Sequence, residues 1–120
     1  MTDAIICDLD GTLSINDHGR SYFKADDCDK DSLNEPVALV LEMAKEFCIQ
    51  IIYLSGREDK YRNPTEKFLK KHDLDFDDVS EEWSYPLFMR KTGDKRADDI
   101  IKLEIYQEHI EPNYDIQFIL

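Results

Sequence analysis

Positive charge is scarce in this sequence of 120 residues. Lysine and arginine together number 15 against 27 aspartates and glutamates, so the formal net charge is −12 with histidine neutral. This balance excludes a wide, uniformly basic surface of the kind that follows a nucleic-acid backbone. A phosphate-bearing ligand must therefore meet a local positive site, which a divalent cation and a few basic side chains can supply.

Other absences exclude several locations and functions for this chain. No apolar run approaches the roughly 20 residues that cross a bilayer, so we expect no membrane partner. The three cysteines form no C-x-x-C pair and no signal peptide precedes them, which predicts a reduced, cytoplasmic setting. The three histidines lack zinc-like spacing, which favours structural or surface roles. The pattern G-x-x-x-x-G-K-S/T is absent, so this chain alone is not expected to transfer phosphate from ATP.

The first half of the sequence contains a strand, helix, strand pattern. Residues 4–7 form an apolar run that stops at Asp8, which predicts a central strand buried on both faces. Residues 14–34 are polar and predict an irregular or hairpin-like excursion. A helix beginning at Pro36 and a strand over residues 49–54, ending in a loop, would complete a right-handed parallel crossover. The inward positions of that helix are expected to be Val37, Val40, Leu41, Ala44, Phe47 and Cys48.

The second half continues the alternation and favours one α/β domain with a parallel sheet. Asn63 as cap and Glu66 in a capping box predict a helix to about residue 72, followed by an acidic linker over residues 73–85. Residues 86–89 are expected to form a third strand and residues 116–120 a fourth. Between them, Asp94 is a plausible cap for a helix that ends before Pro112. Its inward stripe is expected to contain Ala97, Ile100, Ile101, Ile105 and Tyr106.

Chemically useful side chains follow the predicted strands. Asp8 and Asp10 flank the turn after the first strand, and Ser55-Gly56-Arg57 follows the second. Ligands of open α/β sheets bind outside the carboxyl ends of the strands, where these segments and Lys102 would converge. Each of these candidate residues also has a simpler explanation. Asp-Gly and Ser-Gly are ordinary turn pairs, and an arginine can be a surface residue. Lys102 can also form an i,i+4 ion pair with Asp98 on the helix.

The segments resemble the haloacid dehalogenase superfamily and, more narrowly, the phosphatase domain of the phage polynucleotide kinase/3′-phosphatases. The resemblance covers nearly the whole chain in order. It implies a Rossmann-like three-layer α/β fold with a central parallel sheet. The matching segments are Asp8-Leu9-Asp10-Gly11-Thr12, Gly19-Arg20, Ser55-Gly56-Arg57-Glu58, Asn63-Pro64-Thr65, Lys95-Arg96-Ala97-Asp98-Asp99 and Lys102.

The resemblance also implies a role for each matching residue. Asp8 would be the nucleophile that forms an aspartyl-phosphate, and Asp10 the general acid and base. Both would ligate Mg²⁺, Asp8 through its carboxylate and Asp10 through its backbone carbonyl. Lys102 would offset the negative charge of the nucleophile and the phosphoryl group. The substrate-binding residues would be Thr12, Ser55 and Gly56 around the phosphoryl group and Arg20 and Arg57 on the substrate side.

The C-terminus departs from the family pattern. The last acidic pair of the superfamily would begin where this chain ends, at Leu120, and Asp98-Asp99 lies within a predicted helix instead. We therefore expect a single domain over residues 1–120 that is truncated at its C-terminus and lacks its last helix and strand. Apolar sheet surface exposed in this way predicts either a homodimer or poor solubility.

Three functions follow as hypotheses. The first is a magnesium-dependent phosphomonoesterase that removes a 3′-phosphate from a polynucleotide or nucleotide end. The second is a phosphatase of free nucleotides or other small phosphomonoesters, which would share the core motifs and differ at Arg20, Arg57 and residues 14–34. The third is a non-catalytic module, because the last acidic motif is missing.

Overall fold

The computed structural model describes residues 1–21, 24–75 and 85–120, and it contains a four-stranded parallel sheet. The strand order is β5-β4-β1-β6, so the first strand of the chain lies inside the sheet, as predicted. The second strand of the sequence pattern, β4, pairs directly with β1, and the last strand, β6, lies on its other side. The strands are β1 (Thr2–Cys7), β4 (Gln50–Glu58), β5 (Leu87–Arg90) and β6 (Tyr114–Ile119).

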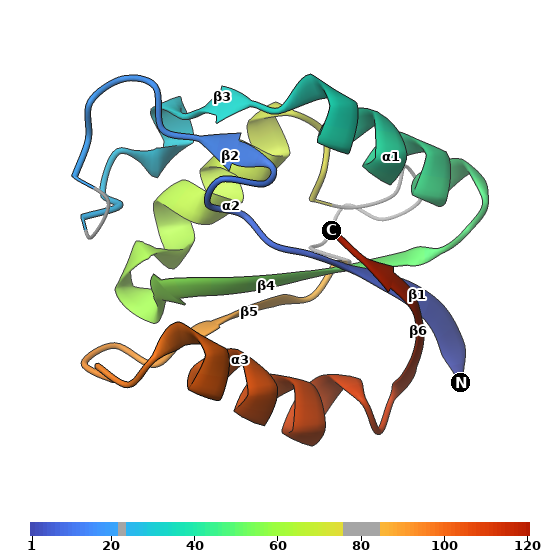
Figure 1. Cartoon of the computed structure of the whole chain (residues 1–120). Helices are drawn as coiled ribbons and strands as arrows, with labels where there is room; N and C mark the ends of the chain where they lie inside the picture. Colours follow the sequence, from blue (N-terminus) through green and yellow to red (C-terminus); the bar gives the residue numbers. More distant parts are fainter. Residues whose placement is uncertain (22–23, 76–84) are drawn as a thin grey trace.

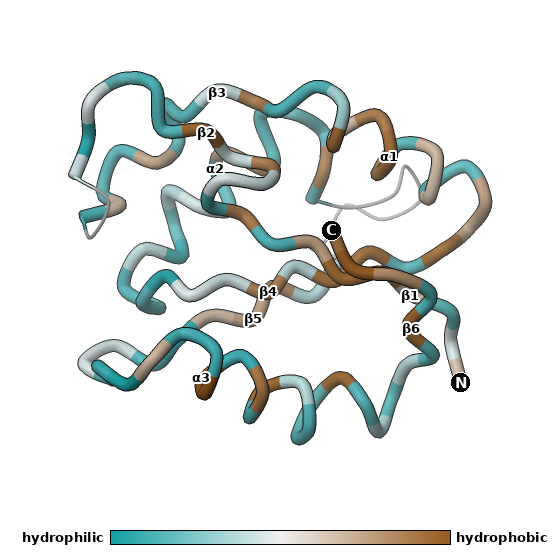
Figure 2. Tube along the Cα trace, viewed as in Figure 1, coloured by the Kyte–Doolittle hydropathy of each residue, from teal (hydrophilic) through white to brown (hydrophobic). Residues whose placement is uncertain are grey.

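Helices cover both faces of this sheet and give three layers (Figure 1). Helices α1 (Glu35–Glu46) and α2 (Arg62–Lys71) lie on one face, and α3 (Asp98–Ile105) lies on the other. The alternation of side chains along β1 explains why both faces need covering: Ile5 and Cys7 join the core under α1 and α2, while Ala4 and Ile6 join the core under α3. Figure 2 shows hydrophobic stretches along the strands in the middle of the molecule and largely hydrophilic connections around them.

The excursion predicted for residues 14–34 is a small antiparallel hairpin above the sheet. Its strands β2 (Ser14–Ile15) and β3 (Ser32–Leu33) pair with each other, and a short 3₁₀ turn, η1 (Cys28–Lys30), packs against α2. Lys67 Nζ lies 3.4 Å from Asp29 Oδ2 and ties α2 to this turn. The hairpin is therefore anchored to the main domain on the side where the strands end.

Several predicted boundaries were wrong for local reasons. Strand β4 does not end at residue 54 but continues to Glu58, with an irregular register between Ser55 and Glu58. Helix α2 begins at Arg62, and no side chain caps it, so the capping box of Asn63 is absent. Helix α3 begins at Asp98, because the carboxylate of Asp94 accepts hydrogen bonds from the backbone and guanidinium of Arg96 in a separate turn.

Some residues expected to face inward lie at the surface. Phe47 is 74% exposed because α1 ends at Glu46, and Cys48 follows it with a positive φ of 58°. Ile100 is 48% exposed, whereas Ile101 on the same helix is buried. Most of the acidic linker, residues 76–84, lies outside the described residues. No helix in the described ranges has the length and apolar character that crossing a membrane requires.

Candidate active site

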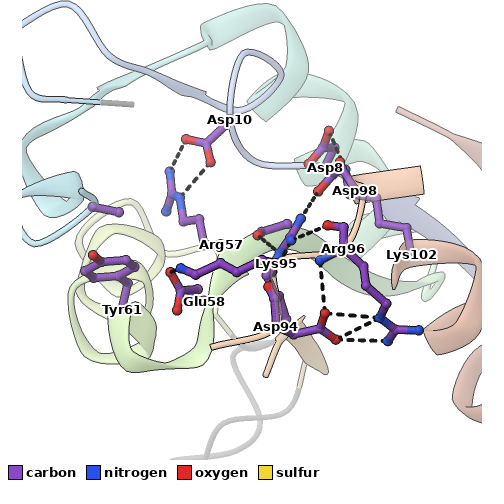
Figure 3. A pocket seen from close by; sticks show the side chains of 13 residues that line it. Asp8, Asp10, Arg57, Glu58, Tyr61, Asp94, Lys95, Arg96, Asp98 and Lys102 are labelled. Atoms are coloured by element: carbon purple, nitrogen blue, oxygen red, sulfur yellow. Dashed lines mark hydrogen bonds and ion pairs between the residues drawn. The ribbon is translucent and has the colours of Figure 1, made fainter. Parts of the chain in front are cut away.

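A pocket opens at the carboxyl ends of β1, β4 and β5, with a volume of 540 Å³ (Figure 3). The predicted convergence of the strand ends is therefore present for most of the candidate residues. Residues of the 90–98 segment form another part of the wall, together with Glu58 and Tyr61. The candidate residues that line the pocket are Asp8, Asp10, Gly56, Arg57 and Lys102.

Asp8 is the first residue after β1, and its carboxylate is half-exposed in the pocket. Its Oδ1 accepts a hydrogen bond of 2.8 Å from the N–H of Leu9, and its Oδ2 lies 3.1 Å from Lys102 Nζ. The chain can leave the strand sharply because Gly11 adopts a φ of 79°, a conformation that favours glycine. The Asp8 carboxylate is thus fixed in direction while remaining open to a ligand.

Lys102 connects Asp8 to helix α3. Its Nζ also lies 3.2 Å from Asp98 Oδ2, so the expected i,i+4 ion pair and the contact with Asp8 exist together. Burial lowers the pKa of Lys102, but the negative charge of Asp8 and the contact with Asp98 outweigh it, and the net pKa is raised. The ammonium group therefore stays charged beside the candidate nucleophile.

The carboxylate of Asp10 is held by two arginines. Arg57 donates from Nε to Oδ2 over 3.0 Å and from Nη2 to Oδ1 over 2.8 Å, and Arg20 donates from Nη2 to Oδ1 over 3.0 Å. Arg57 also donates to the hydroxyl groups of Thr65 and Ser14. Such bidentate pairing fixes the plane of the carboxylate as well as its position.

Asp31 in the hairpin contacts the same two arginines that hold Asp10. Its buried carboxylate accepts hydrogen bonds of 2.9 and 2.7 Å from Arg20, lies 3.4 Å from Arg57 Nη2, and also contacts Ser14 and His18. Burial raises the pKa of Asp31, but the hydrogen bonds from Arg20, Ser14 and His18 outweigh this and lower it to about 2. We call Arg20, Arg57 and Asp31 the arginine clamp.

On the opposite wall, Gly56 makes room for Asp98. A Cβ atom on Gly56 would lie 1.7 Å from Asp98 Oδ1, so only glycine permits this approach. Arg90 joins the same contact, because it donates to the carbonyl of Gly56 over 2.9 Å and to Asp98 Oδ1 over 3.2 Å. We call Arg90, Asp98 and Lys102 the lysine side of the pocket.

The structure gives some predicted substrate-binding residues other neighbours. The donors of Arg20 go to Asp10 and to the hairpin, and those of Arg57 go to Asp10, to the hairpin and to Thr65 of α2. Ser55 is fully buried, and its hydroxyl accepts a hydrogen bond from the N–H of Arg57. Thr12 does not line the pocket within the described chain; its carbonyl accepts from Asn34. Their direct contact with a substrate stays a prediction.

Sequence reasoning missed Asp31 and the positioning roles of Arg90 and Asp98. Arg90 is the last residue of β5, so the rule that ligands meet strand ends could have found it. Asp98 was noticed as a partner of Lys102 and as part of the acidic pair Asp98-Asp99, but its contacts with Gly56 and Arg90 were not. Nothing in the sequence distinguishes Asp31 from the other aspartates around it, because its role depends on how the hairpin folds over the sheet.

The oxygen donors available for a metal ion are few. Within the described ranges, no three histidine, cysteine, aspartate or glutamate side chains group as metal ligands. Mg²⁺, however, commonly takes only one or two carboxylates and completes its shell with water and substrate phosphate. The half-exposed carboxylate of Asp8 fits that mode, and the backbone carbonyl of Asp10, two residues later, would be the second oxygen ligand. The neighbouring Cys7 does not compete as a thiolate, because burial raises its pKa to about 12.

A parallel sheet with two aspartates after its first strand and a lysine directed at the first of them defines an HAD-type phosphatase. The model of the family described as polynucleotide kinase PNKP phosphatase domain matches residues 2–120. The chain therefore belongs to this family, as the sequence motifs predicted.

Relatives place the same domain in longer proteins. A protein of Autographa californica nuclear polyhedrosis virus, provisionally named a bifunctional polynucleotide kinase/RNA ligase, is 29% identical over 94% of this chain. The chain spans only 15% of that protein. A chain of the solved Pnkp1/Rnl/Hen1 complex is 47% identical, with a TM-score of 0.88 over 99% of this chain and 38% of that one.

A more distant structure shows the fold alone. The class C acid phosphatase from Bacillus anthracis with tungstate bound has a TM-score of 0.66 and 18% identity. Its match covers 98% of this chain and 50% of the acid phosphatase chain. The Rossmann-like three-layer α/β fold expected from the sequence is thereby confirmed.

Proposed function

We propose that this chain is a magnesium-dependent phosphomonoesterase that removes the 3′-phosphate from a polynucleotide or nucleotide end. The observation that carries the proposal is the pairing of an open carboxylate, Asp8, with a charged Lys102, beside a second carboxylate, Asp10, that is held in a fixed plane. Membership of the polynucleotide kinase phosphatase family supports a polynucleotide substrate.

The first step would form an aspartyl-phosphate. A carboxylate oxygen of Asp8 bonds to phosphorus while the bond from phosphorus to the 3′-oxygen breaks, and a protonated Asp10 gives its proton to the leaving oxygen. Lys102 offsets the charge that gathers on the carboxylate and the phosphoryl oxygens. The arginine clamp would hold Asp10 two residues from the nucleophile through Oδ1, and Oδ2 would release its contact with Arg57 Nε when it carries the proton for the leaving oxygen.

The second step would release inorganic phosphate. The carboxylate of Asp10 takes a proton from water, whose oxygen attacks phosphorus as the bond to Asp8 breaks. Asp8 returns as a carboxylate and Asp10 as an acid. Mg²⁺, held by Asp8 and the Asp10 carbonyl, would supply positive charge against the phosphoryl oxygens in both steps.

The direct test is release of phosphate from 3′-phosphorylated DNA and RNA oligonucleotides with Mg²⁺, beside a 3′-mononucleotide and p-nitrophenyl phosphate. We expect turnover of the oligonucleotides and a loss of about 10⁴-fold or more in Asp8→Asn, which keeps the shape of the side chain. Equal turnover in Asp8→Asn would contradict the proposal. Turnover confined to the small substrates would favour the phosphatase of free nucleotides.

The covalent intermediate has its own test in Asp10→Asn. p-Nitrophenolate leaves without a proton, so formation of the intermediate should continue in this variant while its hydrolysis slows. We expect a burst of about one p-nitrophenolate per chain followed by slow turnover. A linear time course with no burst at an unchanged rate would argue against Asp10 acting on the intermediate.

A further inference from the structure

We propose that Lys60, Lys91 and Lys95 form a basic rim that binds the phosphate next to the terminal one, so that a polynucleotide end is preferred over a free nucleotide. The inference rests on the proposed function, because it assumes that the terminal phosphate lies at Asp8. It commits to a single-stranded 3′ end as the occupant.

Charge is unevenly distributed around the pocket. Residues 90–96 contain four basic residues and one acidic residue, in a chain that carries 27 acidic and 15 basic residues overall. On the hairpin side of the pocket, acidic residues outnumber basic ones. Ala25 lines the pocket, the exposed Asp26 and Asp27 follow it, and residues 24–31 contain four aspartates and two lysines. A negatively charged strand leaving the pocket would be repelled by the hairpin side and attracted to the side of residues 90–96.

The turn that carries Lys60 and the loop that carries Lys91 and Lys95 are joined to each other. The N–H of Lys60 donates to Thr92 Oγ1 over 3.0 Å, which ties the turn after β4 to the loop after β5. Glu58 makes the same connection, since it accepts from Gly93 N over 2.9 Å and from Lys95 Nζ over 3.1 Å. Both Glu58 and Lys95 line the pocket, as Figure 3 shows. The rim therefore begins at the pocket wall.

The acidic residues beside the rim already have partners. Asp59 pairs with Arg62 at 2.8 Å, Asp94 pairs with Arg96 at 2.9 Å, and Glu58 forms an ion pair with Lys95. Within residues 1–21, 24–75 and 85–120, no ion pair involves Lys60 or Lys91, and both are exposed. Lys95 is 76% exposed despite its contact with Glu58, so its ammonium group can exchange that partner for a phosphate.

The rim also explains how an acidic protein can bind a polyanion. Two or three lysines match one backbone phosphate, not an extended strand, so the contact is short. A pocket of 540 Å³ has room for the terminal nucleotide, and the next phosphate would then leave the pocket over the edge that carries Lys60 and Lys91. A mononucleotide has no such phosphate and gains nothing from the rim.

The experiment measures kcat/KM against KCl concentration for a 3′-phosphorylated hexanucleotide and a 3′-mononucleotide. For the chain without substitutions, we expect the plot of log kcat/KM against log KCl concentration to be steeper for the hexanucleotide than for the mononucleotide. The slopes should differ by about 0.7 to 1, the value of one phosphate contact. In Lys60→Ala/Lys91→Ala the ratio of hexanucleotide to mononucleotide kcat/KM should fall about fivefold to tenfold, and the two slopes should converge.

The matched control is Lys30→Ala/Lys70→Ala, which removes two exposed lysines, one from η1 and one from the C-terminal half of α2. If this control lowers the ratio and the slope as much as the rim variant, only the total charge matters and the rim is overturned. An unchanged ratio in the rim variant overturns it as well.

A binding measurement separates the rim from the proposed catalysis. Anisotropy of a labelled 3′-phosphorylated hexanucleotide with Asp8→Asn should show the same loss of affinity and salt slope when Lys60→Ala/Lys91→Ala is added. If the full chain hydrolyses nothing but this loss is seen, the proposed function fails and the rim stands. If the chain hydrolyses the hexanucleotide but the rim substitutions change neither binding nor ratio, the rim fails alone.

Discussion

Asp10 and Asp8 are held by neighbours of very different exposure. In the arginine clamp the side chains of Arg20 and Arg57 are 4% and 3% exposed, and that of Asp31 is fully buried. On the lysine side, Lys102 is 24% exposed and Asp98 is 55% exposed. The Asp10 carboxylate is thus held by a buried network, whereas the Asp8 carboxylate, the proposed nucleophile and metal ligand, lies at an open wall.

The two sides also differ in what they would contribute to stability. Removing one partner of a buried ion pair leaves an unpaired buried charge, which is strongly destabilising. An ion pair that water reaches contributes little, because solvent screens it. The arginine clamp should therefore serve folding and orientation together, and the lysine side should serve charge at the reacting atoms.

The largest expected difference comes from replacing each basic group by methionine. Arg57→Met leaves Asp10 and Asp31 to share Arg20 as their only arginine partner in the described chain, so it should lower the free energy of unfolding by about 3 kcal/mol. Lys102→Met should lower it by less than about 1 kcal/mol. Both should lose phosphatase activity by about 10²-fold or more. Urea denaturation followed by circular dichroism measures the stability, and phosphate release measures the activity. Equal destabilisation by the two substitutions would contradict the proposed difference between the arginine clamp and the lysine side.

Acid should act on the arginine clamp through Asp31. The folded pKa of about 2 lies below the ordinary value of 3.8, so the carboxylate stabilises the fold above about pH 4 and loses that contribution as the pH falls toward 2. The shift corresponds to about 2 kcal/mol. We expect the difference in unfolding free energy between the full chain and Asp31→Asn to shrink by this amount between pH 5 and pH 2.

Asp26→Asn is the matched control for this measurement, since Asp26 lies exposed in the same excursion. A difference between the full chain and Asp31→Asn that stays constant from pH 5 to pH 2 would show that the charge of Asp31 does not stabilise the fold.

The parts of the fold that follow from periodicity and strand ends were predictable from sequence. The apolar run before Asp8 places β1 inside the sheet, and the helical position of Lys102 brings it to the same edge. The partners of Arg57 were not predictable, because its contacts with Asp10 and Asp31 span 47 and 26 residues. The N-cap of helix α3 was placed three residues too early, at Asp94 instead of Ala97, because the Asp94 carboxylate accepts hydrogen bonds from Arg96. The homodimer expected from the sequence stays a prediction.

The smallest effect should come from one methyl group at Gly56. In Gly56→Ala the new Cβ would lie 1.7 Å from Asp98 Oδ1, so the Asp98 carboxylate must move and Lys102 loses one of its two partners. We expect kcat to fall about tenfold, or about 1.4 kcal/mol, with little change in stability because this wall is open to water.

Asp98→Ala provides the background that isolates this contact. Once the carboxylate is gone, the methyl group has no atom to displace, so Gly56→Ala should lower kcat less than about twofold further. This double-mutant cycle measures the coupling between the two positions directly. If the factors by which the two substitutions lower kcat simply multiply in the double variant, the two positions are not coupled. Gly56 would then act on the phosphate through its own backbone, and the lysine side would tolerate movement of the exposed Asp98 carboxylate.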